Sequence, residues 1–426
     1  MYEFFLRNIF QIKFIICLLF SILIYLSFRI DLVYEFNTKV LVSFIAIQFI
    51  IWGIVFFSKK KTISIIFYNL FFIVVLNLLF TPIFHLFTFD VPSRQPNYKA
   101  MINYKSEFFE GIFSGKHYIS ADKKGFRTNK LINYKNKNKN TVRIFTIGAS
   151  TTEQPDTDDN KTWSNLLGKK LEEQIEKKIE VINSGVAGLR AEHHYITFKK
   201  IKKYKPDLVI FLTGINDWNY HITNSDKVYL ISSYEIKYHF KKSILFKTFS
   251  NINKQINKKI GIKKNLKSID PSTDPEAYLL PQIDSVNKRT SIKNFKPSNV
   301  SQDYQYWMNL IIQECKKEDP TCIFLDQPTA YKKNISDRLI KRLWMTPPNK
   351  DYTLNFGNLI HISSLYNNWL KENITKNELN FCLLSDQIEA NTTHLSDDCH
   401  FSENGSKKVA DVLSSYINLS LKSILN

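Results

Sequence analysis

The sequence predicts an α/β domain with a parallel sheet, preceded by N-terminal transmembrane helices. Three long apolar runs open the chain, and from residue 141 short β-branched runs alternate with segments of helical spacing. Such alternation is typical of a parallel sheet with helices on both faces, where ligands bind at the carboxyl ends of the strands. We therefore divide the 426 residues into a membrane anchor (1–89), a linker segment (90–140) and the α/β domain (141–426), with an insertion at about 220–300.

Each apolar run is close to the roughly 20 residues that cross a bilayer as a helix. The runs are Ile9–Phe28, Val40–Phe57 and Ile63–Phe89. A cleaved secretory signal is the weaker interpretation of the first run, because it lacks a small-residue cleavage site and two further runs follow. Lys59, Lys60 and Lys61 lie between the second and third runs, so the positive-inside rule puts this loop and the N-terminus in the cytoplasm. We expect a multi-pass protein of the cytoplasmic (inner) membrane, with the α/β domain periplasmic or extracellular.

The formal charge of +19 raises the question of nucleic-acid binding, because clustered basic residues release counterions from phosphates. Lysine far outnumbers arginine throughout the chain, which is also rich in Asn, Ile and Phe. This pattern indicates compositional drift and not a dedicated basic face. No helix-turn-helix, zinc-finger or RNA-binding signature accompanies the charge. We expect a solvated, lysine-rich surface and no nucleic-acid partner.

Four cysteines lie beyond the apolar runs, and an even number can form two disulfides in an oxidising compartment. They are Cys315, Cys322, Cys382 and Cys399, and their pairing stays open. They lack the paired Cys-x-x-Cys or histidine spacing of zinc sites. We therefore expect no metal and no cofactor.

The predicted strands are short and apolar, and the predicted helices have apolar residues at helical spacing. The strands are Val142–Ile147, Ile179–Asn183, Leu208–Thr213 and Cys322–Asp326; the helices are Trp163–Gln174, Glu192–Lys203, Tyr304–Lys316, Leu359–Lys371 and Glu403–Leu421. Two long segments, Tyr220–Val300 and Pro328–Asn355, interrupt the alternation. Long loops at the carboxyl edge commonly shape a binding site, and a disordered or packing insertion is the alternative.

A candidate nucleophile follows the first predicted strand. Gly148 and Ala149 lead into Ser150, which places a small hydroxyl residue in a tight turn from strand to helix. Ser150 is preferred to Thr151 because it directly follows the turn. A serine that caps a helix would look similar.

Candidate donors for a developing oxyanion follow the second and third strands. The second strand leads to Gly185 and Gly188, whose spacing allows the backbone to approach a substrate closely and to direct an N–H at it. The third leads to Asn216 and Asp217, and the amide of Asn216 could supply a second donor. Taken alone, both are more often turn residues.

A candidate base lies just before the closing helix. A serine hydroxyl needs a base to take its proton, and histidine serves best when a carboxylate holds its tautomer. Asp397 and His400, three residues apart, could form that unit. Asp398 is the alternative carboxylate. His394 is the alternative base, but it precedes the acidic pair.

Together these motifs make the chain resemble the SGNH or GDSL hydrolase superfamily, over roughly Val142 to the C-terminus. The matching blocks, in the family's order, are Gly148–Ser150, Asn183–Gly188, Gly214–Asp217 and Asp397–His400. Ala149 stands where the first block often carries Asp. The resemblance implies a flavodoxin-like three-layer fold.

The resemblance also implies roles for individual residues. Ser150 would be the nucleophile, His400 the base and Asp397 its orienting carboxylate. The N–H groups of Ser150 and Gly188 and the side chain of Asn216 would form the oxyanion hole. Asp122–Asn129, which contains Gly125-Phe126-Arg127, resembles the pre-catalytic element of membrane-tethered and exported bacterial members, some of which modify cell-surface polysaccharides.

The expected function is that of a serine-dependent ester hydrolase or O-acyltransferase, working through an acyl-serine on an acylated cell-envelope glycan or lipid outside the membrane. Three spans are too few to form an acyl-carrying channel, so a transferase would need a membrane partner that exports the acyl donor. The alternative is a catalytically silent glycan-binding or assembly protein with the same fold. The intact Ser, Gly, Asn, Asp and His set argues against this alternative.

Overall fold

The computed structural model of the chain describes residues 94, 96–128, 130–223, 273–317, 320–347 and 350–420. Within these ranges, no helix has both the length and the apolar character needed to cross a membrane. The three runs expected to span the membrane, at residues 9–89, lie outside the described ranges, as does most of the insertion expected at 220–300.

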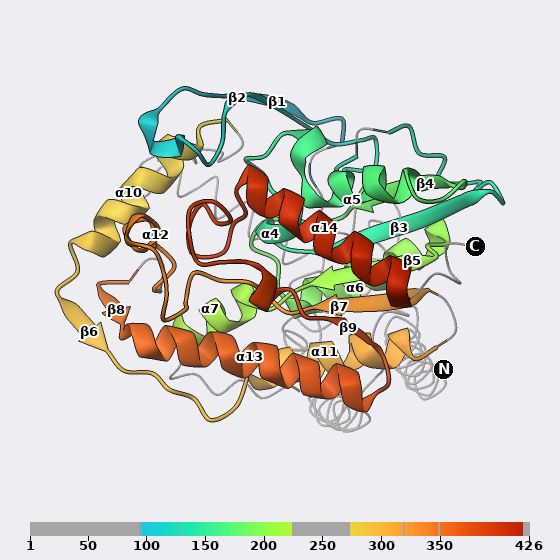
Figure 1. The fold of residues 1–426 in the computed structure, drawn as a ribbon. Helices are drawn as coiled ribbons and strands as arrows, with labels where there is room; N and C mark the ends of the chain where they lie inside the picture. The colour runs from blue at the N-terminus through green and yellow to red at the C-terminus, as the bar shows by residue number, and fades with distance from the viewer. Residues whose placement is uncertain are drawn as a thin grey trace, which may run out of the picture. The chain divides into compact units, whose positions relative to one another are not determined.

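In the described part of the chain, five parallel strands form one sheet, in the order β4 (Lys178–Asn183), β3 (Thr141–Gly148), β5 (Leu208–Leu212), β7 (Thr321–Leu325) and β9 (Asn380–Cys382) (Figure 1). Counted along the chain this is the order 2-1-3-4-5 of flavodoxin-like sheets. All residues of β3 are buried, because a central strand covered by helices on both faces has no side toward solvent. The predicted α/β fold with a parallel sheet is confirmed.

Helices cover both faces of this sheet (Figure 1). They are α5 (Trp163–Glu172), α6 (Ala191–Ile201), α11 (Gln302–Cys315), α13 (Phe356–Lys376) and α14 (Glu403–Ser420), with the short helices α4 (Ser150–Glu153) and α7 (Ile215–Thr223) after β3 and β5. The steps from β3 to β4 and from β4 to β5 run in opposite directions along the sheet. Because parallel crossovers are right-handed, α5 and α6 lie on opposite faces. α14 packs against α5, and α11 packs against α6.

Strand register sets the packing of the core beside the helices. Phe211 of β5 is paired in register with Phe324 of β7, and their rings stack with centroids 4.9 Å apart. Phe198 of α6 packs edge-on against Phe211 from the helical layer. Each ring is fully buried or nearly so, which is worth on the order of 1.5–3 kcal/mol of transfer free energy.

The segment expected to be a linker contains an antiparallel hairpin of β1 (Lys99–Tyr104) and β2 (Gly115–Ser120). Its inner face is buried, with Ile102, Tyr104 and Ile119 at most 8% exposed. The hydroxyl of Tyr104 donates to the backbone oxygen of Asp156, 2.6 Å away, in the loop that follows α4. The sequence did not predict this hairpin, because polar and aromatic residues alternate along it and only a few side chains form its apolar face.

The described parts of the two long segments also meet. α10 (Pro275–Asn287) and β6 (Ser291–Lys293) belong to the first segment, and α12 (Asp337–Ile340) and β8 (Tyr352–Leu354) to the second. β6 and β8 pair in parallel. Short 3-10 helices complete the described structure: η1 (Glu107–Phe109), η2 (Asp159–Lys161), η3 (Lys202–Tyr204) and η4 (Ser385–Gln387).

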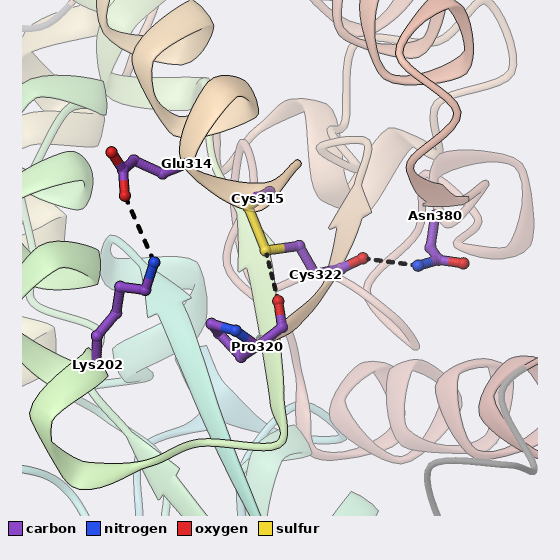
Figure 2. The surroundings of a disulfide bond; sticks show 6 residues. All are labelled: Lys202, Glu314, Cys315, Pro320, Cys322 and Asn380. Carbon is purple, nitrogen blue, oxygen red and sulfur yellow. Dashed lines mark hydrogen bonds and ion pairs between the residues drawn. A yellow bond between two sulfur atoms is a disulfide. The ribbon is translucent and has the colours of Figure 1, made fainter. Parts of the chain in front are cut away.

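One disulfide joins Cys315, the last residue of α11, to Cys322 in β7, with Cα atoms 5.9 Å apart (Figure 2). Cys382 and Cys399 are free and buried, so of the two bridges that the four cysteines could form, the described residues contain one. The bridge lies at the amino-terminal end of β7. There Asn380 also donates from Nδ2 to the backbone oxygen of Cys322 at 3.0 Å.

We expect replacement of both disulfide cysteines by serine (Cys315→Ser with Cys322→Ser) to lower the free energy of unfolding by about 2–3 kcal/mol. The bridge closes a loop with a sequence separation of 7, and opening it increases the entropy of the unfolded chain. Thermal unfolding followed by circular dichroism measures the loss. Reductant should lower the unfolding midpoint of the unaltered protein and leave that of the double variant unchanged; equal responses would contradict a stabilising bridge.

Candidate active site

The turn after β3 places Ser150 as the first residue of α4. A Cβ on Gly148 would lie 2.1 Å from Oγ1 of Thr152 and 2.4 Å from the backbone oxygen of Leu212, so this close approach requires glycine. The N–H of Ser150 has no acceptor within the helix, because the first N–H groups of a helix never do. The alternative hydroxyl, on Thr151, is fully buried and donates to Gln327 at 3.3 Å.

The structure brings Ser150, His400 and Asp397 together. With His400 protonated on Nδ1, the hydroxyl of Ser150 donates to Nε2 of His400 at 2.8 Å, and Nδ1 donates to Oδ2 of Asp397 at 2.8 Å. Asp398 makes other contacts: it accepts from the Tyr331 hydroxyl at 2.8 Å and from the backbone N–H of Trp344 at 2.8 Å. The carboxylate that contacts the histidine is therefore that of Asp397.

The pKa values of the two neighbouring carboxyl groups, Asp397 and Asp398, shift in opposite directions. Burial opposes ionisation of Asp397, but the charge of His400 and hydrogen bonds from His400, Cys399 and Trp344 hold the pKa of Asp397 well below its usual range. Burial, together with the charge of Asp397, raises the pKa of Asp398 to about 7. Burial lowers the pKa of His400, but the facing Asp397 outweighs it and raises that pKa well above 6.5.

Two of the expected oxyanion donors, Gly188 and Asn216, come from neighbouring segments. Asn216, near the start of α7, donates from Nδ2 to the backbone oxygen of Leu189 at 2.9 Å, which leaves its second N–H available. Leu189 follows Gly188, which is exposed and has a φ of +79°, in the region that favours glycine. Asn216 thus lies beside the loop that carries Gly188.

Asn183 and Arg127 hold the backbone around Ser150. Nδ2 of Asn183 donates to the backbone oxygen of Thr152 at 2.6 Å, and its Oδ1 accepts from the N–H of Gly185 at 2.9 Å. The buried guanidinium of Arg127 donates to the backbone oxygen of Glu153, at the end of α4, at 2.5 Å and to backbone oxygens of the loop after it. Sequence reasoning assigned Arg127 no role of its own, although it lies in the segment that resembles a pre-catalytic element.

Trp344 provides a further hydrogen bond to the Asp397 carboxylate, at the same oxygen that contacts His400. Its indole Nε1 donates to Oδ2 of Asp397 at 2.9 Å, and Trp344 is 8% exposed. Trp344 comes from the second long segment, 328–355, for which the sequence indicated only a loop able to shape a site. An indole N–H has no acceptor capacity, so this contact can only stabilise a carboxylate that accepts.

Among the residues that the structure describes, Asp397, Cys399 and His400 bring three potential metal ligands within 4.8 Å of one another. Both ring nitrogens of His400 already have partners in Ser150 and Asp397. This arrangement suits proton transfer between a hydroxyl and an imidazole held by a carboxylate.

One family model and several solved structures are similar to this chain. The family model for GDSL-like lipase/acylhydrolase matches residues 144–413. Similar solved structures include a GDSL-like lipase from Bacteroides thetaiotaomicron VPI-5482, at 11% identity over 68% of this chain and 91% of that chain (TM-score 0.33). They also include an acetylxylan esterase from Geobacillus stearothermophilus, at 13% identity over 65% of this chain and 94% of that chain (TM-score 0.35). No curated protein matches the chain.

We expect the rate at which a fluorophosphonate labels Ser150 to rise with pH through a midpoint above 6.5. Only neutral His400 can accept the proton of Ser150, and the pKa of His400 is raised by Asp397. Asp397→Asn removes that charge, so the midpoint should move to lower pH while the limiting rate falls about 1,000- to 10,000-fold.

Asp398→Asn is the matched control for this pH profile. It removes a neighbouring carboxyl group whose hydrogen bonds go to Tyr331 and to backbone N–H groups instead of His400. The pH midpoint and the limiting labelling rate of Ser150 should change less in Asp398→Asn than in Asp397→Asn. A larger change for Asp398→Asn than for Asp397→Asn would show that Asp397 is not the orienting carboxylate.

Trp344→Phe should lower the labelling rate of Ser150 by roughly 10- to 100-fold, because a hydrogen bond to a charged group contributes about 1.5–3 kcal/mol. Phenylalanine keeps an aromatic ring at this position, although a smaller one, and lacks the indole N–H. Stopped-flow labelling at high pH, where His400 is neutral in all variants, measures the effect. A rate within twofold of that of the unaltered protein would show that the indole N–H does not support Asp397.

Proposed function

The chain belongs to the GDSL-like lipase/acylhydrolase family, and on that premise we propose that it cleaves carboxylic esters through an acyl-serine intermediate on Ser150. Membership of the family makes it an ester hydrolase by class. The observation that carries the chemistry is the hydrogen bond of 2.8 Å between Oγ of Ser150 and Nε2 of His400. A serine without such a base is a weak nucleophile at neutral pH.

In the proposed first step, Nε2 of His400 takes the proton from Ser150 as Oγ attacks the acyl carbonyl carbon. The carbonyl oxygen becomes an oxyanion, and the N–H groups of Ser150 and Gly188 and the amide of Asn216 stabilise it. His400 then gives its proton to the leaving alcohol oxygen as the ester bond breaks. Asp397 remains ionised throughout and holds the imidazolium that forms in between.

In the second step, an acceptor hydroxyl attacks the acyl carbon of the acyl-serine as His400 takes its proton. The bond between the acyl carbon and Oγ of Ser150 then breaks, and His400 returns the proton to Oγ, which restores the free serine. Water as acceptor makes the protein an esterase, and a sugar hydroxyl makes it an O-acyltransferase. Every residue named above serves both outcomes, because they differ only in the molecule that occupies the acceptor position. A transferase would also require a membrane partner that delivers the acyl donor.

We propose an acylated glycan or lipid of the cell envelope as substrate, on the outer side of the cytoplasmic membrane. Support comes from the three apolar runs between residues 9 and 89 and from the lysines at 59–61, which favour an external domain. The disulfide between Cys315 and Cys322 is in keeping with an oxidising compartment.

The full-length protein in detergent, supplied with an activated acetyl ester, tests this function. Acetate release should fall at least 1,000-fold in Ser150→Ala, whereas Thr151→Ser, which keeps the neighbouring hydroxyl and removes only a methyl group, should keep most of the rate. Mass spectrometry should find the acetyl group on Ser150 after rapid quenching. Equal rates for Ser150→Ala and the unaltered protein would exclude the mechanism.

Adding an acylatable glycan separates the two outcomes of the second step. Acetate release that is independent of the glycan would identify an esterase. Acetyl groups on the glycan, with a matching drop in free acetate, would identify a transferase.

A further inference from the structure

The last residue of α4, Glu153, has a buried carboxylate that connects two distant parts of the chain. Its side chain is 3% exposed, and it pairs with Arg94, whose side chain is 12% exposed. Arg94 Nε donates to Oε1 of Glu153. The other oxygen, Oε2, accepts from the backbone N–H of Ala187 at 2.6 Å. Glu153 thus lies three residues after Ser150, and its carboxylate binds the residue that directly precedes Gly188.

The loop before Gly188 is held tightly at this point. A Cβ on Gly185 would lie 2.5 Å from the backbone nitrogen of Glu153, so the loop and α4 are in direct backbone contact. The N–H of Val186 donates to the backbone oxygen of Gly148 at 3.2 Å. Beyond Val186, the carboxylate of Glu153 is what holds the next peptide, and this peptide leads directly into Gly188.

The ion pair connects this loop to the start of the described domain. Arg94 lies five residues before β1, and its guanidinium also stacks over the ring of Tyr98, with Cζ 4.7 Å from the ring centroid. The last apolar run expected to cross the membrane ends near residue 89. Arg94, in the segment that follows the expected membrane anchor, is therefore connected through Glu153 to the loop that carries Gly188.

We propose that Arg94 and Glu153 are positioning residues for the oxyanion hole, an inference that rests on the proposed function. Arg94 orients the Glu153 carboxylate, Glu153 holds the N–H of Ala187, and the next N–H, that of Gly188, is thereby aimed at the carbonyl oxygen of the substrate. Neither side chain takes part in proton transfer. Their effect belongs to the transition state, because the negative charge on the oxygen develops only there.

The test compares Glu153→Gln, Arg94→Gln and Arg94→Lys in the full-length protein in detergent, with an activated acetyl ester as substrate. Rates are expressed per active site, counted by fluorophosphonate titration, so that unfolded molecules do not contribute. Glu153→Gln and Arg94→Gln should lower kcat about 10- to 100-fold and change KM less than twofold, since a whole oxyanion donor is worth about 100- to 1,000-fold. Arg94→Lys keeps a cation and should recover part of the loss.

A boronic acid provides a readout that a purely structural role would not move. It forms a tetrahedral adduct with the serine, whose oxygen occupies the oxyanion position. Its affinity should fall in proportion to kcat in Glu153→Gln and Arg94→Gln. A fall in kcat with unchanged boronic acid affinity would overturn the proposal, and so would an unchanged kcat per active site.

Glu180→Gln is the matched control, because Glu180 also forms a deeply buried ion pair, with Arg143 at 2.8 Å and side-chain exposures of 5% for Glu180 and 1% for Arg143. That pair joins the amino-terminal halves of β3 and β4, away from the nucleophile. Glu180→Gln should lower the unfolding midpoint and leave kcat per active site unchanged.

The unaltered protein distinguishes failure of the proposed function from failure of this inference. If it neither hydrolyses the ester nor is labelled, the proposed function is refuted. If it is active and the Arg94 and Glu153 variants are unaffected, this inference alone is refuted.

Discussion

The catalytic geometry depends on one hydrogen bond, between Ser150 and His400, which joins residues 250 positions apart. Ser150 opens α4 just after β3, and His400 lies in the loop just before α14. These elements are held together near the site as well, because the side chain of Gln154, just after α4, donates to Ser406 of α14 at 2.5 Å. The loop before α14 is equally constrained: a Cβ on Gly405 would lie 1.9 Å from the backbone oxygen of His394.

Buried polar groups hold the loops around this bond. Where a parallel strand ends, its chain leaves the ladder, and the backbone groups beyond it need other partners. Arg127 donates to carbonyl groups at the end of α4 and beyond it. The carboxylate of Glu153 accepts from the N–H of Ala187, and that of Asp398 accepts from the N–H groups of Trp344 and its neighbour. Charged partners make these hydrogen bonds strong, and removal of one partner leaves an uncompensated buried charge, which is costly.

Local patterns in the sequence were sufficient for the sheet and for the ends of its strands. The apolar strand segments and helical spacings predicted the alternation that places β3, β4, β5 and β7 in one parallel sheet. Short stretches after the strands and before the last helix carried Ser150, Asn216 and His400, and the fold brings Ser150 and His400 into contact because the turn after β3 and the loop before α14 meet. The edge strand β9 and the hairpin of β1 and β2 escaped detection, since each has only a few buried residues.

What the sequence by itself determined is the α/β class, the family resemblance and the set of residues able to perform the chemistry, because periodicity and motif spacing are local properties. Only the tertiary structure decided which of Asp397 and Asp398 contacts His400, which cysteines pair, and that Trp344 and Arg94 reach the site. These facts depend on the direction of side chains from segments many residues apart, and that direction is set by packing and buried hydrogen bonds, which no local pattern records.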